Sequence, residues 1–322
     1  MQLSKTDGMY LYNSATVPFL AEVLKLFISL ATIGISHLVG AKPLKMTMDW
    51  TVMVKYAVPS ILYMIANNLS LEILKYLRPS TYQILGNLRI VTTGLLTVTL
   101  LGRSLARIQW VALIMMTVGA ATSQLGEGSE ASKYSSNPLI GYALSFLLCL
   151  VASLAGVYTE RVMKGNDDSI HWQNTQLYGF GVIFNVIRLS VDDAASAYHN
   201  GFWMITLLHG YSTTTWLVVC NLAFSGLLVS FIMKYVDVIA KNFSTASAMF
   251  LTPIAALPLF GHSPTLSLLL GAIIAALSLF LFYAKKDDLF NVSEREFAAL
   301  NVRLEPEDPN PLGLPQHKSS LS

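Results

Sequence analysis

Arg89 lies in the middle of a long apolar segment, where a permanent positive charge is unexpected. The stretch from Pro79 to Gly102 contains no other charged residue. A guanidinium at the centre of a bilayer costs ~2.5–3.5 kcal/mol even on the lenient insertion scale, and its planar fork suits phosphate or carboxylate. Glu72 is the only carboxylate in the neighbouring apolar segments. The sequence therefore predicts that Arg89 contacts an anionic ligand, with a buried ion pair to a carboxylate as the alternative.

Lys241 supplies a second cation at the start of another apolar segment, in AKNFSTASAM. It would reach the same anion as Arg89 from the opposite side of the site. The alternative is a lysine at a helix end whose ammonium group extends to the membrane surface. Its position favours this alternative slightly, whereas the serines and threonines that follow favour a ligand. Both interpretations stay open at this point.

Amides and tyrosines recur at helical spacing in two further apolar segments. Tyr63 and Asn67 stand four residues apart in YMIANNLS, and Asn174 and Tyr178 stand four apart in HWQNTQLYGFG. Each pair therefore shares a helix face. Amides can read the donor and acceptor edges of a base, and tyrosines can stack on it. Together with the two cations, they fit an anionic ligand with a polar aromatic ring; hydrogen bonds between helices are the alternative.

Glu22 and Lys25 lie three residues apart in AEVLKLF and can neutralise each other on one helix face. A structural ion pair is the favoured interpretation. The alternative is a proton-coupled carboxylate, as in a drug/proton antiporter.

The composition shows what surrounds these residues. Of the 322 residues, 53% are hydrophobic and 12% are charged, against about 25% charged in soluble domains. This is the composition of an integral membrane protein. A net charge of +2 gives no reason to expect a nucleic acid partner. Cys149 and Cys220 lie in apolar segments, which predicts reduced core residues. The sequence contains no catalytic motif and no metal-ligand spacing of histidines, so neither an enzyme nor a cofactor is expected.

The fold class predicted is an all-α membrane protein with nine spans. Residues 1–284 would form the transporter domain, and residues 285–322 a cytosolic disordered tail. Lysines and arginines divide nine to four between the two sides, which places the tail in the cytosol and the N-terminus on the other side. The apolar segments are 12–39, 50–76, 79–101, 105–124, 138–162, 171–190, 213–235, 239–260 and 263–284.

An internal repeat relates the two halves of the chain. LKYLRPSTYQ matches MKYVDVIAKN, and LLGRSLA matches LFGHSPT, both at an offset of 159 residues, which aligns Tyr82 with Lys241. The repeats would comprise residues 1–125 and 138–284, with the first of ten helices absent. Because five helices are an odd number, the repeats would be inverted, as is typical of secondary transporters. Chance similarity between apolar helices is the alternative.

Five segments carry a resemblance to a known family: AEVLKLFISL, VPSILYMIANNLS, TYQILGNLRIVTTGLLTVTLLGRSLARIQW, LAGVYTERVMK and MKYVDVIAKNFSTASAM. They resemble the nucleotide-sugar transporters of the drug/metabolite transporter superfamily, and most of all the CMP-sialic acid transporters. The resemblance implies ten helices in two inverted repeats, a Golgi location, and exchange of a cytosolic nucleotide sugar for a lumenal nucleoside monophosphate. The positions that match the family's nucleotide site are Tyr63, Asn67, Tyr82, Arg89, Asn174, Tyr178 and Lys241.

The function that the resemblance implies is a Golgi antiporter of CMP-linked sugar and CMP, without a cofactor. Its partners would be these ligands and the lipid bilayer, with a homodimer as an open arrangement. Three residues depart from the animal CMP-sialic acid transporters: Arg89 replaces a lysine, Ala66 a glutamine and Phe180 a serine. These changes bear on the identity of the sugar that is carried more than on the identity of the nucleotide. The alternatives are a transporter of UDP-galactose or UDP-N-acetylglucosamine and, less favoured, a proton-coupled drug or metabolite exporter.

Overall fold

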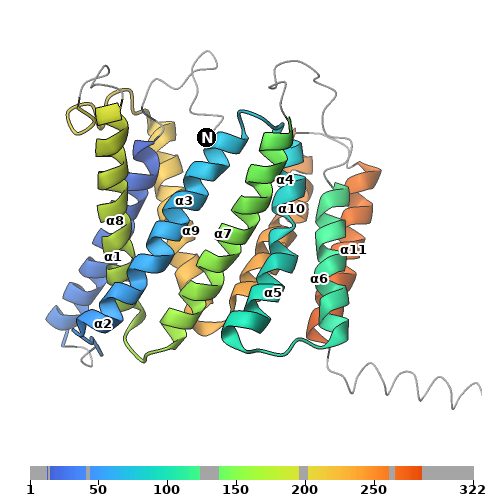
Figure 1. The fold of residues 1–322 in the computed structure, drawn as a ribbon, viewed down its shortest axis with the longest axis horizontal. Helices are drawn as coiled ribbons and strands as arrows, with labels where there is room; N and C mark the ends of the chain where they lie inside the picture. The colour runs from blue at the N-terminus through green and yellow to red at the C-terminus, as the bar shows by residue number, and fades with distance from the viewer. Residues whose placement is uncertain are drawn as a thin grey trace, which may run out of the picture.

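A computed structural model describes residues 13, 15–40, 44–123, 138–195, 202–260 and 265–284, with side chains except at 71, 79, 80, 138 and 252–260. The regular structure within these ranges is helical throughout (Figure 1). The elements are α1 (Thr16–Leu38), α2 (Trp50–Met53), η2 (Val54–Tyr56), α3 (Ala57–Ile73), α4 (Pro79–Gly86), α5 (Arg89–Leu101), α6 (Arg107–Ser123), α7 (Pro138–Lys164), α8 (Ile170–Ala195), α9 (Thr213–Tyr235), α10 (Val238–Phe260) and α11 (Leu266–Tyr283). Each apolar segment predicted from the sequence is helical over most of its described residues. The predicted disordered tail lies outside the described residues.

Local signals in the sequence set several helix ends. Ser212 and Thr215 form a capping box that starts α9, and the Thr265 hydroxyl accepts a hydrogen bond from the Leu268 amide at the start of α11. Pro79 occupies the first turn of α4, where its missing N–H costs nothing. Gly102 ends α5 with φ of 66°, a left-handed conformation that glycine adopts without strain. These ends fix the length and direction of the helices that carry the site.

The surface of the bundle is apolar, which confirms an integral membrane protein. Large side chains such as Phe27, Leu217, Phe224 and Ile273 are exposed along the helices. Five stretches are long and apolar enough to cross a membrane: Thr16–Leu38, Thr81–Leu101, Leu139–Lys164, Thr213–Tyr235 and Leu266–Tyr283. Cys149 is buried, as predicted, but the prediction of a core position is wrong for Cys220, which is exposed on α9. Apolar sequence alone does not distinguish a core position from the outer surface of a membrane bundle.

Packing between helices arranges them around a central α7. In the view of Figure 1, α1 packs against α8 and α9 at one edge, and α6 packs against α11 at the other. Between them, α7 contacts both α3 and α5, and α10 contacts α5 and α9. One end of the bundle collects the start of α10 and the ends of α5, α7, α9 and α11. Because the predicted tail follows α11 in the sequence, we call this end the tail side.

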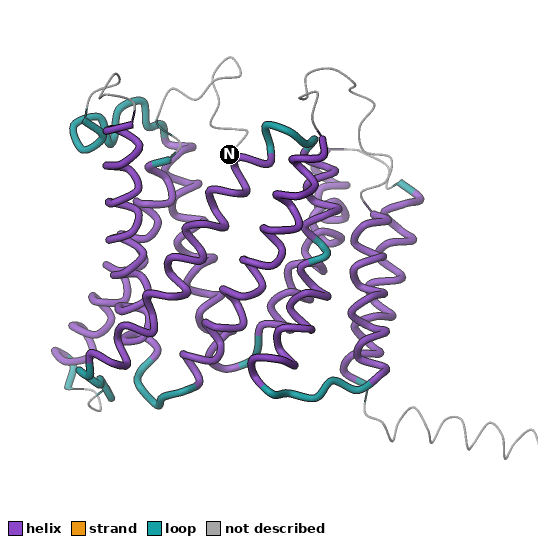
Figure 2. The backbone as a smooth tube through the Cα atoms, viewed as in Figure 1, coloured by secondary structure: helices purple, strands orange, loops and turns teal. Residues whose placement is uncertain are grey.

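The helix that carries Arg89 is interrupted at the centre of its apolar segment. Asn87 and Leu88 form a turn between α4 and α5, visible as a short loop in Figure 2. Here the Leu88 amide donates to the Leu85 carbonyl and the Ile90 amide to the Asn87 carbonyl, each across three residues instead of four. The Leu85 carbonyl also accepts from Cys149 Sγ on α7 at 3.3 Å. Such interruptions are tolerated where neighbouring helices satisfy the backbone groups.

Close approach of α6 and α11 depends on two glycines. A Cβ at Gly271 would lie 2.6 Å from the Gly119 carbonyl oxygen and 2.9 Å from Ser123 Cβ. Small residues at such crossings allow backbones to come into van der Waals contact. We expect Gly271→Ala to lower the melting temperature of the detergent-solubilised protein, because the backbone must shift at a cost of about 1–3 kcal/mol.

Gly34→Ala on α1 is the matched control, because a Cβ there meets nothing within 4 Å. Its melting temperature should equal or exceed that of the unmodified protein. Equal melting temperatures for the two variants would contradict the packing described.

Candidate functional site

Two connected chambers lie within the helix bundle. The first has a volume of about 420 Å³ between α1, α3, α8 and α9. The second has a volume of about 380 Å³ between α3, α4, α5, α7 and α10. Four residues line both chambers and so mark their junction: Tyr63, Asn67, Ser70 and Lys241. A ligand that occupied both chambers would pass these side chains.

Two cations share the second chamber without a carboxylate. Arg89 and Lys241 both line it, no acidic residue does so among the described residues, and the two are close enough to repel each other. The part of the chain that the structure describes provides no ion-pair partner for either cation. Glu72, the alternative partner of Arg89, instead binds Lys75 at 2.6 Å. The chamber is therefore suited to an anion, and the alternative of a structural ion pair with Glu72 is wrong.

Tyr82 and two asparagines complete the wall around these cations. Tyr82 and Asn87 come from α4 and the turn that follows it, and Asn242 comes from α10. Asn87 Nδ2 and Asn242 Oδ1 are buried and have no hydrogen-bond partner among the described residues. Buried polar atoms in native proteins are normally paired. These two atoms are thus available to a ligand.

The first chamber contains the Glu22–Lys25 pair. Lys25 Nζ lies 2.6 Å from Glu22 Oε1, as predicted, and 4.2 Å from the centre of the Tyr178 ring. Glycines on two facing helices make room for the pair. A Cβ at Gly181 would lie 2.8 Å from Glu22 Oε2, and one at Gly226 would lie 2.7 Å from Lys25 Cδ. The pair therefore contributes to the contact of α1 with α8 and α9 as well as to the chamber wall.

The residues predicted from the sequence meet at these chambers with one exception. Tyr63, Asn67 and Lys241 lie at the junction, Tyr82 and Arg89 in the second chamber, and Tyr178 in the first. The Tyr63 hydroxyl accepts from Thr159 at 3.5 Å, and the Tyr178 hydroxyl donates to the Gly226 carbonyl at 3.1 Å. Asn174 lines neither chamber. It is buried in α8, and its Oδ1 has no partner among the described residues.

Asn87 and Asn242 are among the polar lining residues that sequence reasoning missed. Each stands beside a predicted cation, Asn87 two residues before Arg89 and Asn242 directly after Lys241. That adjacency was the available signal. Helical spacing gave a second signal for Asn87, which follows Gln83 by four residues in the same segment, but it gave none for Asn242.

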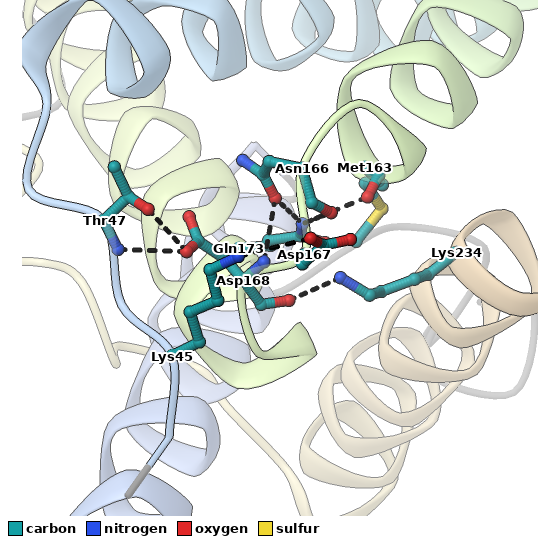
Figure 3. Close-up of polar contacts among 8 residues, drawn as sticks. All are labelled: Lys45, Thr47, Met163, Asn166, Asp167, Asp168, Gln173 and Lys234. Atoms are coloured by element: carbon teal, nitrogen blue, oxygen red, sulfur yellow. Dashed lines mark hydrogen bonds and ion pairs between the residues drawn. The ribbon is translucent and has the colours of Figure 1, made fainter.

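Polar contacts close the tail side of the bundle (Figure 3). Before α2, the Thr47 amide and hydroxyl donate to Asp168 Oδ1 at 3.0 and 2.7 Å. Lys234 at the end of α9 donates to the Asp168 carbonyl at 2.5 Å, and Lys45 pairs with Asp167 at 3.2 Å. The loop between α7 and α8 is thereby joined to two other parts of the bundle.

Glu160 extends the closure to α5 and α10. Its side chain is fully buried and pairs with Arg103 and Lys164, each at 2.8 Å. Its second oxygen accepts from the Val238 amide at 2.8 Å. A buried carboxylate with two cationic partners and a backbone donor is well compensated. We call the whole set of contacts the tail-side network: Lys45, Thr47, Arg103, Glu160, Lys164, Asp167, Asp168, Lys234 and Val238.

Known proteins resemble this chain over most of its length. A family model described as nucleotide-sugar transporter matches residues 1–283. CMP-sialic acid transporter 1 of Arabidopsis thaliana is 46% identical over 294 residues, which cover 90% of this chain and 86% of that protein. CMP-sialic acid transporter 1 of Oryza sativa subsp. japonica is 45% identical, covering 87% of this chain and 88% of that protein. The UDP-galactose translocator of Bos taurus is 34% identical, covering 84% and 70%.

A solved crystal structure supports the fold. It covers 91% of this chain and 89% of its own chain, with a TM-score of 0.57 at 15% sequence identity. Likeness at this identity shows a shared fold.

The Glu22–Lys25 pair can be tested by removing its charges separately and together. Lys25→Met leaves the Glu22 carboxylate without its partner, and we expect a loss of about 3 kcal/mol in stability. The double variant Glu22→Gln/Lys25→Met should recover most of the lost stability, because no unpaired charge is left. Melting temperatures in detergent provide the measurement.

A second pair of the same spacing serves as the control. Glu72 and Lys75 also stand three residues apart with a 2.6 Å contact, but both side chains are exposed. Lys75→Met should therefore cost at most about 1 kcal/mol. A Lys25→Met variant as stable as the unmodified protein would exclude a structural role for the buried pair.

Proposed function

Because this chain belongs to the nucleotide-sugar transporter family, we propose that it is an antiporter that exchanges a CMP-linked sugar of the CMP-sialic acid type for CMP. One observation carries the proposal: two cations share a chamber with no carboxylate among its described lining residues. A phosphate group would compensate both. The arginine fork supplies two parallel donors, and the lysine adds a point charge.

The two chambers divide the ligand between them. The phosphate lies near the junction, where Lys241 faces both chambers. The nucleoside occupies the second chamber, against Tyr82 and the asparagines, and the sugar extends into the first, toward Tyr178 and Asn185. Tyr63 and Asn67 contact the ligand where it passes from one chamber to the other. After the sugar has been transferred elsewhere, CMP alone would fill the second chamber and the junction.

Pairwise helix contacts support two inverted repeats. The repeat derived from the sequence relates α1 to α8, α3 to α9, α4 and α5 to α10, and α6 to α11. Corresponding helices pack against each other in the pairs α1–α8, α5–α10 and α6–α11, and the contact of α1 with α9 has its counterpart in α8 with α3. By this mapping α7 is the first helix of the second repeat, and its counterpart would precede α1. The repeats, residues 1–125 and 138–284, would rock against each other around the chambers.

The tail-side network corresponds to a state closed toward the cytosol. The excess of lysine and arginine on the tail side supports a cytosolic tail, and with nine spans the N-terminus lies on the opposite side. We place the protein in the Golgi membrane with its substrate entering from the tail side. Entry then requires that the network open. Asn174 is buried and lines neither chamber in this state. It would become part of the cavity when the tail-side network opens.

Two other functions are less well supported. The similarity to UDP-galactose translocators keeps a UDP-sugar as the second candidate, and binding of CMP and UMP to the purified protein separates the two. A proton-coupled exporter would need a carboxylate free to take up protons. Glu22 is instead held 2.6 Å from Lys25, which supports a structural role.

Arg89→Ala tests the assignment of the phosphate site. We expect loss of CMP exchange by at least about 100-fold in proteoliposomes, because a desolvated charge-assisted contact to the ligand disappears. The melting temperature of the empty protein should stay equal or rise, since repulsion with Lys241 is relieved. Arg107→Ala, at an exposed arginine that lines neither chamber, should exchange normally. Unchanged CMP exchange by Arg89→Ala would refute the assigned role.

Glu160→Gln tests the closure on the tail side. The neutral side chain loses two ion pairs, so the population of the state open toward the tail should rise. A cysteine placed at Asn174, with Cys149 and Cys220 replaced by serine, should then react several-fold faster with a thiol reagent applied from the tail side.

The control is Asp167→Asn, which removes an ion pair on the same side whose members are both exposed. In this variant, the cysteine at position 174 should react at the same rate as in the protein whose tail-side network is unchanged. Equal rates for Glu160→Gln and Asp167→Asn would refute the idea that Glu160 holds the tail side closed.

A further inference from the structure

The start of α10 is held to α7 by a buried carboxylate. Glu160 Oε2 on α7 accepts a hydrogen bond from the amide of Val238, the first residue of α10, at 2.8 Å. Its other oxygen, Oε1, pairs with Arg103 and Lys164 at 2.8 Å each. The Glu160 side chain is fully buried. One carboxylate therefore joins the beginning of α10 to two cations of the tail-side network.

Two further contacts fix the first residue of α10 against α7. Lys164 donates to the carbonyl of Val236, just before the helix begins. Gly156 lies one turn before Glu160 on α7, and a Cβ at Gly156 would lie 2.8 Å from Val238 Cγ2. Val238 thus packs closely onto α7 in the same place where Glu160 binds its amide. The position of the helix start is set by packing and by a backbone hydrogen bond together.

Carboxylates satisfy early backbone amides of α10. The Val238 amide donates to Glu160, and the Ala240 amide donates to Asp237 Oδ1 at 2.6 Å. The first amides of an α-helix have no partner within the helix, and negative charges near its N-terminus stabilise it. The Lys241 amide then donates to the Asp237 carbonyl at 3.2 Å, across four residues as in a regular helix. Lys241 therefore belongs to the turn that the two carboxylates stabilise.

The ammonium group of Lys241 reaches the ligand site from this turn. Lys241 lines both chambers, although a lysine near a helix end can also extend its long side chain to the membrane surface. A first turn that frayed would allow the side chain to leave the chambers toward water on the tail side. Glu160 forms its ion pairs with Arg103 and Lys164. Its influence on Lys241 therefore passes through the backbone of α10.

We propose that Glu160 is a positioning residue for the phosphate site, which directs Lys241 into the chambers by holding the first turn of α10 against α7. The inference rests on the proposed function, because it assumes that Lys241 binds the phosphate of a nucleotide. It goes beyond the role of Glu160 in closing the tail side. When the tail-side network opens, the first turn of α10 is released and the contact of Lys241 with the phosphate weakens. Opening toward the tail side and release of the ligand there are then coupled.

The preference for CMP over cytidine, which lacks the phosphate, measures the contribution of the phosphate site. Dissociation constants for both would be measured by calorimetry in detergent. The unmodified protein should prefer CMP by ~10- to 100-fold, as expected for hydrogen bonds to charged groups. Glu160→Met keeps the length of the side chain and removes the acceptor, so the preference should fall at least ~3-fold. For two ligands of the same conformation, a change in its population alters both dissociation constants by one factor and cancels in their ratio.

The Lys241→Met background shows whether the effect passes through Lys241. Once the ammonium group is absent, its position no longer matters, so adding Glu160→Met should leave the preference unchanged. Asp237→Ala is a second probe of the same turn, because it removes the acceptor of the Ala240 amide. It should lower the preference in the same direction. The Asp237 side chain is 30% exposed, so this variant tests the inference even if Glu160→Met does not fold.

Two control variants separate positioning from charge and from stability. Arg103→Met removes a cation paired with Glu160 but leaves the hydrogen bond to Val238. Thr265→Ala removes the side-chain acceptor at the start of α11, none of whose described residues lines a chamber. Both should keep the preference for CMP, even where the melting temperature falls.

The outcomes separate the inference from the proposed function. Equal binding of CMP and cytidine by the unmodified protein would overturn the phosphate site and the inference with it. A clear preference for CMP that Glu160→Met and Asp237→Ala leave unchanged would overturn the inference alone. An equal fall in either control, or a further fall when Glu160→Met is added to Lys241→Met, would also overturn it. A fall in Glu160→Met that is absent from the controls and from the Lys241→Met background would support it.

Discussion

Repulsion between two cations in one membrane cavity is the constraint around which the structure is organised. Arg89 and Lys241 come from α5 and α10, which pack against each other, and the described lining of their chamber contains no carboxylate. In a medium of low polarity, like charges repel more strongly than in water. An anion bound between the two side chains would relieve this repulsion. The acidic groups of the bundle are engaged elsewhere, with Glu22 on Lys25 and Glu160 on Arg103 and Lys164.

Neutral side chains contact the backbone of Arg89 and the neighbour of Lys241 without adding charge. The turn between α4 and α5 frees backbone carbonyls near Arg89, and α7 satisfies two carbonyls of this region through Cys149 and Ser153. The same serine continues through Thr93 to Asn242, next to Lys241. The backbone of one cation and the neighbour of the other are thus joined by neutral hydrogen bonds across three helices. A salt bridge in this position would have consumed the charge that the ligand needs.

The sequence predicted the helices and most of the chamber, and failed where the answer depends on helices meeting in space. Arg89 was identifiable because a charge in an apolar segment is costly wherever the helix lies, and Tyr63, Asn67 and Tyr178 because four-residue spacing reports a shared face. The same spacing does not bring Asn174 to a chamber in this structure, since a shared face does not say how far along the helix the cavity reaches. The hydrogen bond between Asn242 and Thr93 joins residues 149 positions apart, which no local sequence pattern reveals. The burial of Glu160 likewise follows from Arg103 and Val238, which belong to other elements.

For the antiporter proposed above, the two cations, which have no ion-pair partner among the described residues, give a physical reason for exchange rather than uniport. To change sides, an alternating-access carrier must pass through a state in which its cavity is closed to water on both sides. Without a ligand, Arg89 and Lys241 would be desolvated together, and their repulsion would raise the energy of that state. A bound phosphate removes this penalty on the inward and on the outward journey alike. On this argument the two cations decide that the carrier crosses only when it is loaded.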